Sequence, residues 1–280
     1  MFHPASASSV FVFLLVCGVV VFSFLRGVWI GARAQRRDPL RVTLLVSAGL
    51  LLWLATIAEL VGSGWLEAVP GRLLALGAVV MGGSALLGLS PLGGWLANSC
   101  PISLLLAFQG FRLPLELVLH SWVRQGVIPG TMTWTGSNWD VLSGAAALGL
   151  APLSRHSKAA AWAGNIIGFV LLLNVGRVAV FSAPLSFGWH DVTPKLLLPY
   201  YLPYALVIPV CVGGALAGHI ILTRALLRPN VPSSLRAEDA REAGIRLGLT
   251  NLGSRLPSRN PIGGGLERHR QSKISSDEKV

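Results

Sequence analysis

Four polar side chains recur at helical spacing inside the apolar stretch 101–124. At 100° per residue, Gln109, Arg112, Glu116 and His120 fall within an arc of about 80° on one helix face. Carboxylate and imidazole groups can act as general base and acid or as metal ligands. An Arg at the centre of a membrane helix costs about 2.5–3.5 kcal/mol on insertion scales, so this row requires compensating partners.

Partners for these charges exist within the stretch itself. Arg112 and Glu116 are four residues apart and can neutralise each other, so we predict that they are charge partners inside the helix bundle. Pro114 lies between them, removes a backbone hydrogen bond and is expected to kink the helix. Read conservatively, the row is a buried ion pair that fixes the register of its helix. Read functionally, it is one wall of a polar pocket.

Other polar residues are predicted to reach the same side of the membrane. The stretch 101–124 is expected to run from inside to outside, which places His120 near the outer face. Asn138 and Asp140 precede the next apolar stretch, where they could also simply cap a helix. We predict that Glu116, His120, Asp140 and Asp191 share one cavity on the outer side. The full candidate ligand-binding set is Arg112, Glu116, His120, Asn138, Asp140, Arg177, His190 and Asp191.

The composition defines the elements that must position these groups. Of the 280 residues, 52% are apolar and only 12% are charged, whereas soluble domains have roughly 25% charged residues. The apolar residues form runs long enough for membrane-spanning helices. We therefore predict an all-α polytopic membrane bundle of about seven transmembrane helices. The segments are approximately 8–30, 40–61, 73–89, 101–123, 139–153, 159–181 and 196–222.

Loop charges predict the orientation of these helices. Basic residues gather at the first connection, at the fifth connection and after the last helix, and the positive-inside rule makes these regions cytoplasmic. The N-terminus is then outside and the C-terminus inside, as an odd helix count requires. Residues 1–227 form the transmembrane domain, and residues 228–280 form a basic, mostly disordered cytoplasmic tail. The net charge of +11 indicates contact with anionic lipid at the cytoplasmic face, not with nucleic acid.

Two sequence blocks resemble those of a known group of proteins. One is Phe111-Arg112-Leu113-Pro114-Leu115-Glu116, and the other runs from Met132 to Gly144 as MTWTGSNWDVLSG. They are similar to the FR-x-x-x-E and MT-x-x-G-x-N-x-D-x-L-x-G blocks of an uncharacterised family of bacterial multi-pass membrane proteins. The resemblance covers about residues 100–225. It implies a location in the inner (plasma) membrane and the helix count, and it implies no activity, cofactor or metal.

Several familiar membrane-protein chemistries lack their defining residues. No lysine lies in the middle of a predicted helix, as a retinal protein needs, and no HExxH zinc motif is present. Neither GxxxxGK[ST] nor GxGxxG occurs, so nucleotide binding has no support. Gly82-Gly83-Ser84-Ala85 departs from the G-x-S-G turn of rhomboid proteases. The predicted topology puts His120 and His219 at opposite faces, which excludes a haem held by both.

Three functions remain for the predicted site. The first is binding or passing a small ligand through an outward-facing polar pocket. The second is an intramembrane metal-dependent enzyme, with Glu116 or Asp140 as general base and His120 and His190 as metal ligands or acid. Asp191 would be a further ligand for zinc, which favours His with carboxylate. The third is a membrane assembly or scaffold subunit in which the polar stripe binds another membrane protein.

Overall fold

The computed structural model describes residues 2–69 and 71–228. Within these ranges every regular element is a helix, which confirms the predicted all-α bundle. The predicted tail 228–280 lies outside the described residues, except for Arg228. The elements are α1 (Ala7–Ala34), α2 (Pro39–Gly62), α3 (Gly71–Leu89), α4 (Pro91–Ser99), α5 (Ile102–Phe108), η1 (Gln109–Phe111), α6 (Arg112–Arg124), η2 (Gly130–Met132), α7 (Val141–Leu153), α8 (Lys158–Ser182), η3 (Leu198–Tyr200), η4 (Tyr204–Leu206), η5 (Val207–Val212) and α9 (Gly213–Leu226).

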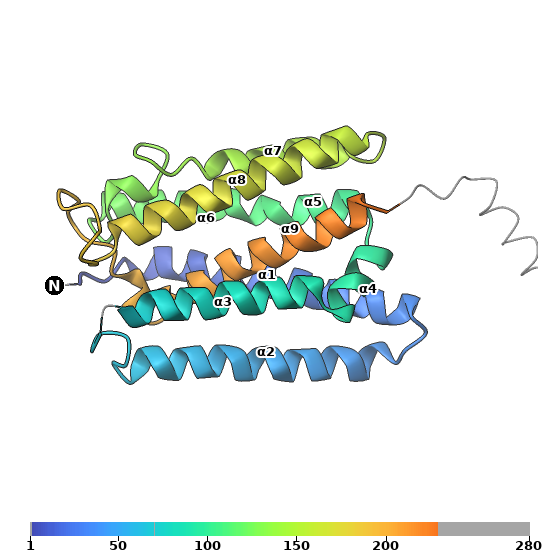
Figure 1. Cartoon of the computed structure of the whole chain (residues 1–280), viewed down its shortest axis with the longest axis horizontal. Coiled ribbons are helices and arrows are strands. Elements are labelled where there is room, and N and C mark those ends of the chain that lie inside the picture. The colour runs from blue at the N-terminus through green and yellow to red at the C-terminus, as the bar shows by residue number, and fades with distance from the viewer. Residues whose placement is uncertain (1, 70, 229–280) are drawn as a thin grey trace, which may run out of the picture. The chain divides into compact units, whose positions relative to one another are not determined.

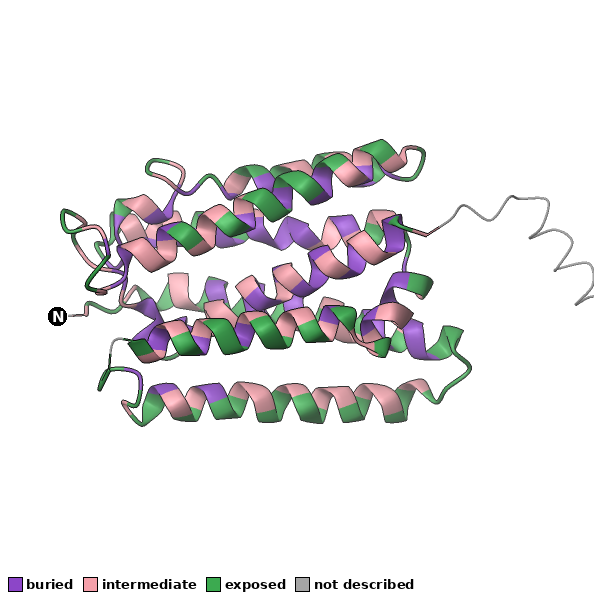
Figure 2. Ribbon diagram, viewed as in Figure 1, coloured by how far each residue is buried: buried purple, intermediate pink, exposed green. Residues whose placement is uncertain are grey.

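Six helical stretches among the described residues are long and apolar enough to cross a membrane. Four are the single helices α1, α2, α3 and α8. The other two are the composite stretches Ile102–Arg124 and Tyr204–Leu226. The chain is therefore an integral membrane protein with a polytopic helical bundle. The composite stretches are the most buried of the six, and α2 is the least buried and packs mainly on α1. Figure 2 shows this contrast between a buried centre and an exposed α2.

The bundle has two chemically different ends. The start of α1 lies at one end, called here the N-terminal end, and the last turn of α9 lies at the other (Figure 1). The second end is called the basic end. It is held together by contacts such as the Arg37 guanidinium over the Trp95 ring and the bonds from Arg224 to the carbonyls of Gly88 and Ser90. Its cationic residues are Arg33, Arg36, Arg37, Arg41, Arg155, Lys158, Arg224 and Arg228.

The helix that carries the polar row is interrupted where its proline requires it. Pro114 has no N–H to donate to the carbonyl of Gly110, and its ring crowds that turn. The chain accordingly changes from α5 through the short 3₁₀ segment η1 to α6, so the interruption lies directly before Arg112. This agrees with the expected kink. It also gives Arg112 and Glu116 a different direction from that of a straight helix.

Two predicted spans have different boundaries in the structure. The segment 139–153 is helical only from Val141, and its 13 residues are about 20 Å long, less than the roughly 30 Å of a bilayer core. The segment 196–222 begins with irregular chain and η3, and the spanning stretch starts at Tyr204. Pro199 and Pro203 explain this late start, because each removes a backbone donor. The residues around Pro209 form a π-helical turn, η5.

Candidate functional site

Arg112 and Asp140 form a buried ion pair at the centre of the bundle. Arg112 Nε donates to Asp140 Oδ2 at 2.7 Å, and Nη2 donates to Asp140 Oδ1. Both residues are buried, with exposed fractions of 1% and 4%. Such a two-pronged contact is the strongest geometry between guanidinium and carboxylate. The predicted pairing of Arg112 with Glu116 is wrong, because the kinked helix and the chain before α7 bring Asp140 to the guanidinium instead.

The ion pair continues into a polar chain between α8 and α9. Arg112 Nη1 donates to the carbonyl of Gly168 at 2.7 Å and contacts His219 Nε2 at 3.2 Å. A guanidinium can only donate, so His219 Nε2 accepts and the ring proton lies on Nδ1. Nδ1 then donates to Asn165 Oδ1 at 2.8 Å, and Asn165 Nδ2 donates to Thr223 Oγ1 at 2.8 Å. These bonds fix the guanidinium from the side opposite Asp140.

On the other side of the ion pair, Asn138 connects Asp140 to Glu116. Asn138 Nδ2 donates to Glu116 Oε1 at 2.9 Å and to the Met132 carbonyl at 3.0 Å. Asn138 Oδ1 accepts from the Asp140 backbone N–H at 3.2 Å. Ser143 Oγ donates to Asp140 Oδ1 at 2.8 Å. Asp140 thus does not cap α7 with its side chain, and its carboxylate is committed to Arg112 and Ser143.

This polar cluster explains how irregular chain is tolerated deep in the bundle. Arg112 is close to the middle of the stretch Ile102–Arg124, so the bonded Asp140 lies at a similar depth. Non-helical backbone at membrane depth is tolerated where protein buries it and satisfies its polar groups. Asn138 does this for Met132 and Asp140, and Asn174 Nδ2 donates to the Ser137 carbonyl at 2.8 Å. Part of the cluster therefore has a structural task.

One carboxylate oxygen of the cluster takes no part in these hydrogen bonds. Glu116 is 1% exposed, and its Oε2 has no hydrogen-bond partner among the described residues. A buried polar atom without a partner costs about 1–3 kcal/mol, and more when it is charged. Glu116 also lines a cavity together with Arg112 and Asp140. The residue that carries this spare acceptor therefore lines a cavity.

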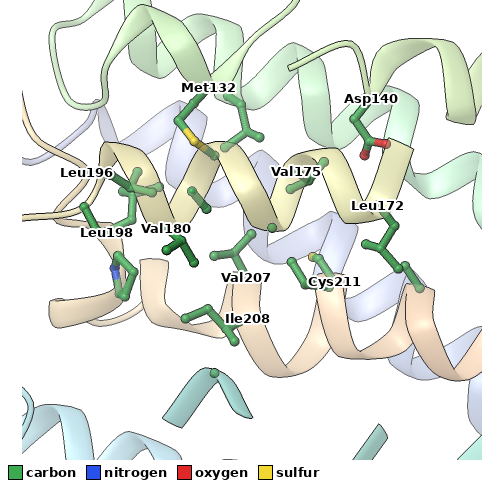
Figure 3. Close-up of a pocket in the computed structure, with 18 of the residues that line it drawn as sticks. Met132, Asp140, Leu172, Val175, Val180, Leu196, Leu198, Val207, Ile208 and Cys211 are labelled. Atoms are coloured by element: carbon green, nitrogen blue, oxygen red, sulfur yellow. The ribbon is translucent and has the colours of Figure 1, made fainter. Parts of the chain in front are cut away.

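The cavity has a volume of about 280 Å³ and an apolar wall. Figure 3 shows Val175 and Val180 of α8 and Val207, Ile208 and Cys211 of η5 around it. In that view Asp140 lies on one side, and Leu196 and Leu198 lie on the other. Of the lining residues, only three carry charge, and they are Arg112, Glu116 and Asp140. The cavity is thus apolar along most of its wall, with all of its charge in one ion-pair cluster.

Part of the cavity wall belongs to the partly exposed surface of two spanning helices, α3 and α8. Leu196, Leu198 and Pro199 are buried and line the cavity from the irregular chain at the N-terminal end. Helices α3 and α8 both contribute lining residues. Helix α3 packs mainly on α9, and α8 packs mainly on α7, so α3 and α8 do not pack mainly on each other. Their lining residues, such as Gly77, Ala78, Gly176 and Ala179, are small and at least partly exposed. The sequence predicts a polar, outward-facing pocket, whereas the wall of this cavity is mainly apolar.

The structure divides the predicted site residues into two groups. Arg112, Glu116, Asn138 and Asp140 are brought together in the cluster described above. The remaining four lie elsewhere. The expectation that Glu116, His120, Asp140 and Asp191 share one cavity is wrong, because neither His120 nor Asp191 lines the cavity. His120 packs on Trp134 instead, and Asp191 belongs to a loop at the N-terminal end.

The four outlying residues have local contacts of their own. The His120 ring stacks on Trp134, with 4.3 Å between ring centroids. Arg177 is exposed, donates to Asn174 Oδ1 and lies over the Trp189 ring. His190 and Asp191 are exposed and line a shallow pocket together with Thr131, Ser137 and residues 187–189 and 192.

The sequence argument missed His219 and Asn165. Both are nearly fully buried in the polar chain that holds Arg112. A signal was present, because a polar or ionisable residue inside a membrane helix usually faces the bundle interior and a partner. The topology placed His219 near the cytoplasmic face and therefore away from Glu116. Arg112 connects the two depths because its long side chain reaches between them.

The described residues contain no group of three or more His, Cys, Asp and Glu side chains placed to hold a metal ion. The zinc arrangement considered from the sequence fails because its two histidines lie outside the central cluster. Comparisons with protein-family models, with curated proteins and with solved structures gave no match.

Proposed function

We propose that this protein binds a small ligand within the membrane, in the cavity beside the Arg112–Asp140 pair. Glu116 supplies the polar contact, and the apolar wall supplies most of the contact area. Sites for small molecules are concave and mostly apolar, with a few fixed polar groups, and have volumes of about 300–1,000 Å³. The cavity of about 280 Å³ lies near the lower limit of that range.

The observation that carries this proposal is the free oxygen of Glu116. The surrounding cluster fixes the carboxylate through Asn138 but leaves Oε2 without a partner. Arg112 and Asp140 are already paired, so they shape the site without needing a ligand. A ligand that donates to Oε2 would supply the partner that this oxygen lacks among the described residues.

The two alternative functions have less support. A metal-dependent enzyme would need converging ligands, and the described residues do not provide them. A scaffold that presents the polar stripe to another membrane protein would need it on the bundle surface, and Gln109, Arg112 and Glu116 are each 1% exposed. A ligand-binding site within the bundle, in contrast, is consistent with the buried position of these polar groups.

The binding proposal can be tested with the fluorescent, neutral aromatic amine 1-aminoanthracene. We expect saturable binding to the wild-type protein in phosphatidylcholine nanodiscs, measured as fluorescence above that of empty nanodiscs. Ala179→Phe should abolish this binding, because Ala179 lines the cavity. Ala163→Phe is the matched control, since Ala163 is exposed on the same helix and does not line the cavity. Equal signals from both variants, or no saturable signal from the wild type, would refute the proposal.

We further propose that the basic end faces the cytoplasm of a bacterial inner membrane and contacts anionic lipid. The supporting observation is the gathering of eight cationic residues, from Arg33 to Arg228, at that end. We expect a reporter that is active only in the cytoplasm to work when fused to the C-terminus and to fail at the N-terminus. The reverse result, or activity at both ends, would contradict this orientation.

A further inference from the structure

The charges around the cavity select the kind of ligand that fits. The cluster contains one guanidinium and two carboxylates, so with both acids ionised it has an excess of one negative charge. Asp140 faces Arg112 directly, whereas Glu116 is bonded only to the neutral amide of Asn138. In a low-dielectric site an uncompensated charge is costly, and an opposite charge on the ligand removes that cost. The free Oε2 of Glu116 therefore favours a cation.

The same oxygen favours a cation that carries N–H groups. An ionised carboxylate oxygen only accepts hydrogen bonds, and a primary ammonium has three donors and no acceptor. Hydrogen bonds between ionised partners are roughly twice as strong as neutral ones. A quaternary ammonium would offer charge without a donor, and an alcohol would offer a donor without charge.

The rest of the cavity wall favours an apolar body on that head. Apolar side chains dominate the wall, many of them from α3, α8 and η5, and they are within reach of one ligand that touches Glu116. Leu198 and Pro199 line the cavity from the N-terminal end, and the partly exposed lining residues of α3 and α8 lie on spanning helices, whose exposed surface borders lipid. A ligand that reaches the site between these two helices must first dissolve in the bilayer, so a small hydrophilic amine is disfavoured.

From these observations we infer that the cavity takes a primary alkylammonium, a protonated amine on one apolar chain, from the bilayer. The inference rests on the proposed function, because it names the class of ligand for the same site. The volume of about 280 Å³ suits a single short chain and not a two-chain lipid. Glu116 is the residue that determines the specificity.

The test is displacement of 1-aminoanthracene from the wild-type protein in phosphatidylcholine nanodiscs by matched compounds. Decylammonium has a positive charge and donors, decanol has a donor only, decyltrimethylammonium has a positive charge only, and decanoate has a negative charge and no donor. We expect decylammonium to displace the dye at concentrations at least about tenfold below those of the other three. Ethylammonium, which has the same head and almost no tail, should not displace it.

The variant Glu116→Gln tests whether Glu116 causes the preference for decylammonium. The amide keeps the shape of the side chain and removes the charge, so the advantage of decylammonium over decanol in displacing the dye should disappear. Size-exclusion chromatography shows whether the variant is folded. If it is not, the ranking of compounds on the wild type still decides the inference.

The outcomes separate the two proposals. Dye binding with no advantage for decylammonium refutes the alkylammonium inference and leaves the ligand-binding proposal standing. Dye displacement by ethylammonium as strong as by decylammonium refutes entry from the bilayer. No saturable dye binding at all refutes the proposed function and the inference together. A decylammonium advantage that survives in folded Glu116→Gln also overturns the inference, because the preference then has another source.

Discussion

Replacing Asp140 with leucine should sharply reduce the amount of folded protein. The change leaves the Arg112 guanidinium buried without its carboxylate partner, and breaking a buried pair in this way costs about 3–5 kcal/mol. That loss is a large fraction of the roughly 5–15 kcal/mol by which folded domains are stable. The measurement is the yield of monodisperse protein in size-exclusion chromatography, with the melting temperature of the folded fraction.

Two double variants identify the true partner of Arg112. Arg112→Leu with Asp140→Leu removes both charges and should recover part of the yield that either single change loses. Arg112→Leu with Glu116→Leu should recover none, because Glu116 is bonded to Asn138 and not to the guanidinium. Recovery in the second variant and not in the first would show that the ion pair runs along the helix, as residue spacing alone suggests.

The sequence predicts the bundle well because its signals are strong and local. Runs of about 20 apolar residues identify four of the spans directly. The basic residues in the loops indicate which connections lie on the same side of the membrane. Hydropathy does not predict the helix boundaries where a spanning stretch is interrupted. Pro199, Pro203 and Pro209 each interrupt the last predicted span, and a hydropathy average does not show where the helix resumes. The short α7 has the composition of a span without its length.

Half of the predicted site residues meet in the cluster, and their pairing differs from the predicted one. Four of the eight proposed residues, among them Arg112 and Asp140, do meet in one buried cluster. Spacing on an ideal helix suggested Arg112 with Glu116, whereas the interruption before Pro114 and the irregular chain before α7 produced a different partner. His120 and Asp191 failed for a related reason, because similar membrane depth does not fix which face of the bundle a residue occupies.

Close contact between α6 and α7 is what holds Asp140 against Arg112. Gly144 is one turn after Asp140, and a Cβ atom added there would lie 2.4 Å from the Leu113 backbone nitrogen and 2.9 Å from its Cα. Backbone atoms cannot move aside as a side-chain end can, so α7 would have to shift away from α6. Small residues permit such approaches between membrane helices. Here the approach also determines the position of the carboxylate.

Gly144→Ala should therefore destabilise the protein by about 1–3 kcal/mol, the usual cost of overpacking, although alanine is the better helix former. Gly149→Ala is the matched control in the same helix, because nothing lies within 4 Å of a Cβ atom added there. We expect its melting temperature to be unchanged or slightly raised. Adding Leu113→Ala to Gly144→Ala should not restore stability, since the tightest contact is with the backbone nitrogen. Equal melting temperatures for the two glycine variants, or rescue by Leu113→Ala, would mean that the two helices are not in backbone contact and that Asp140 is positioned by its hydrogen bonds alone.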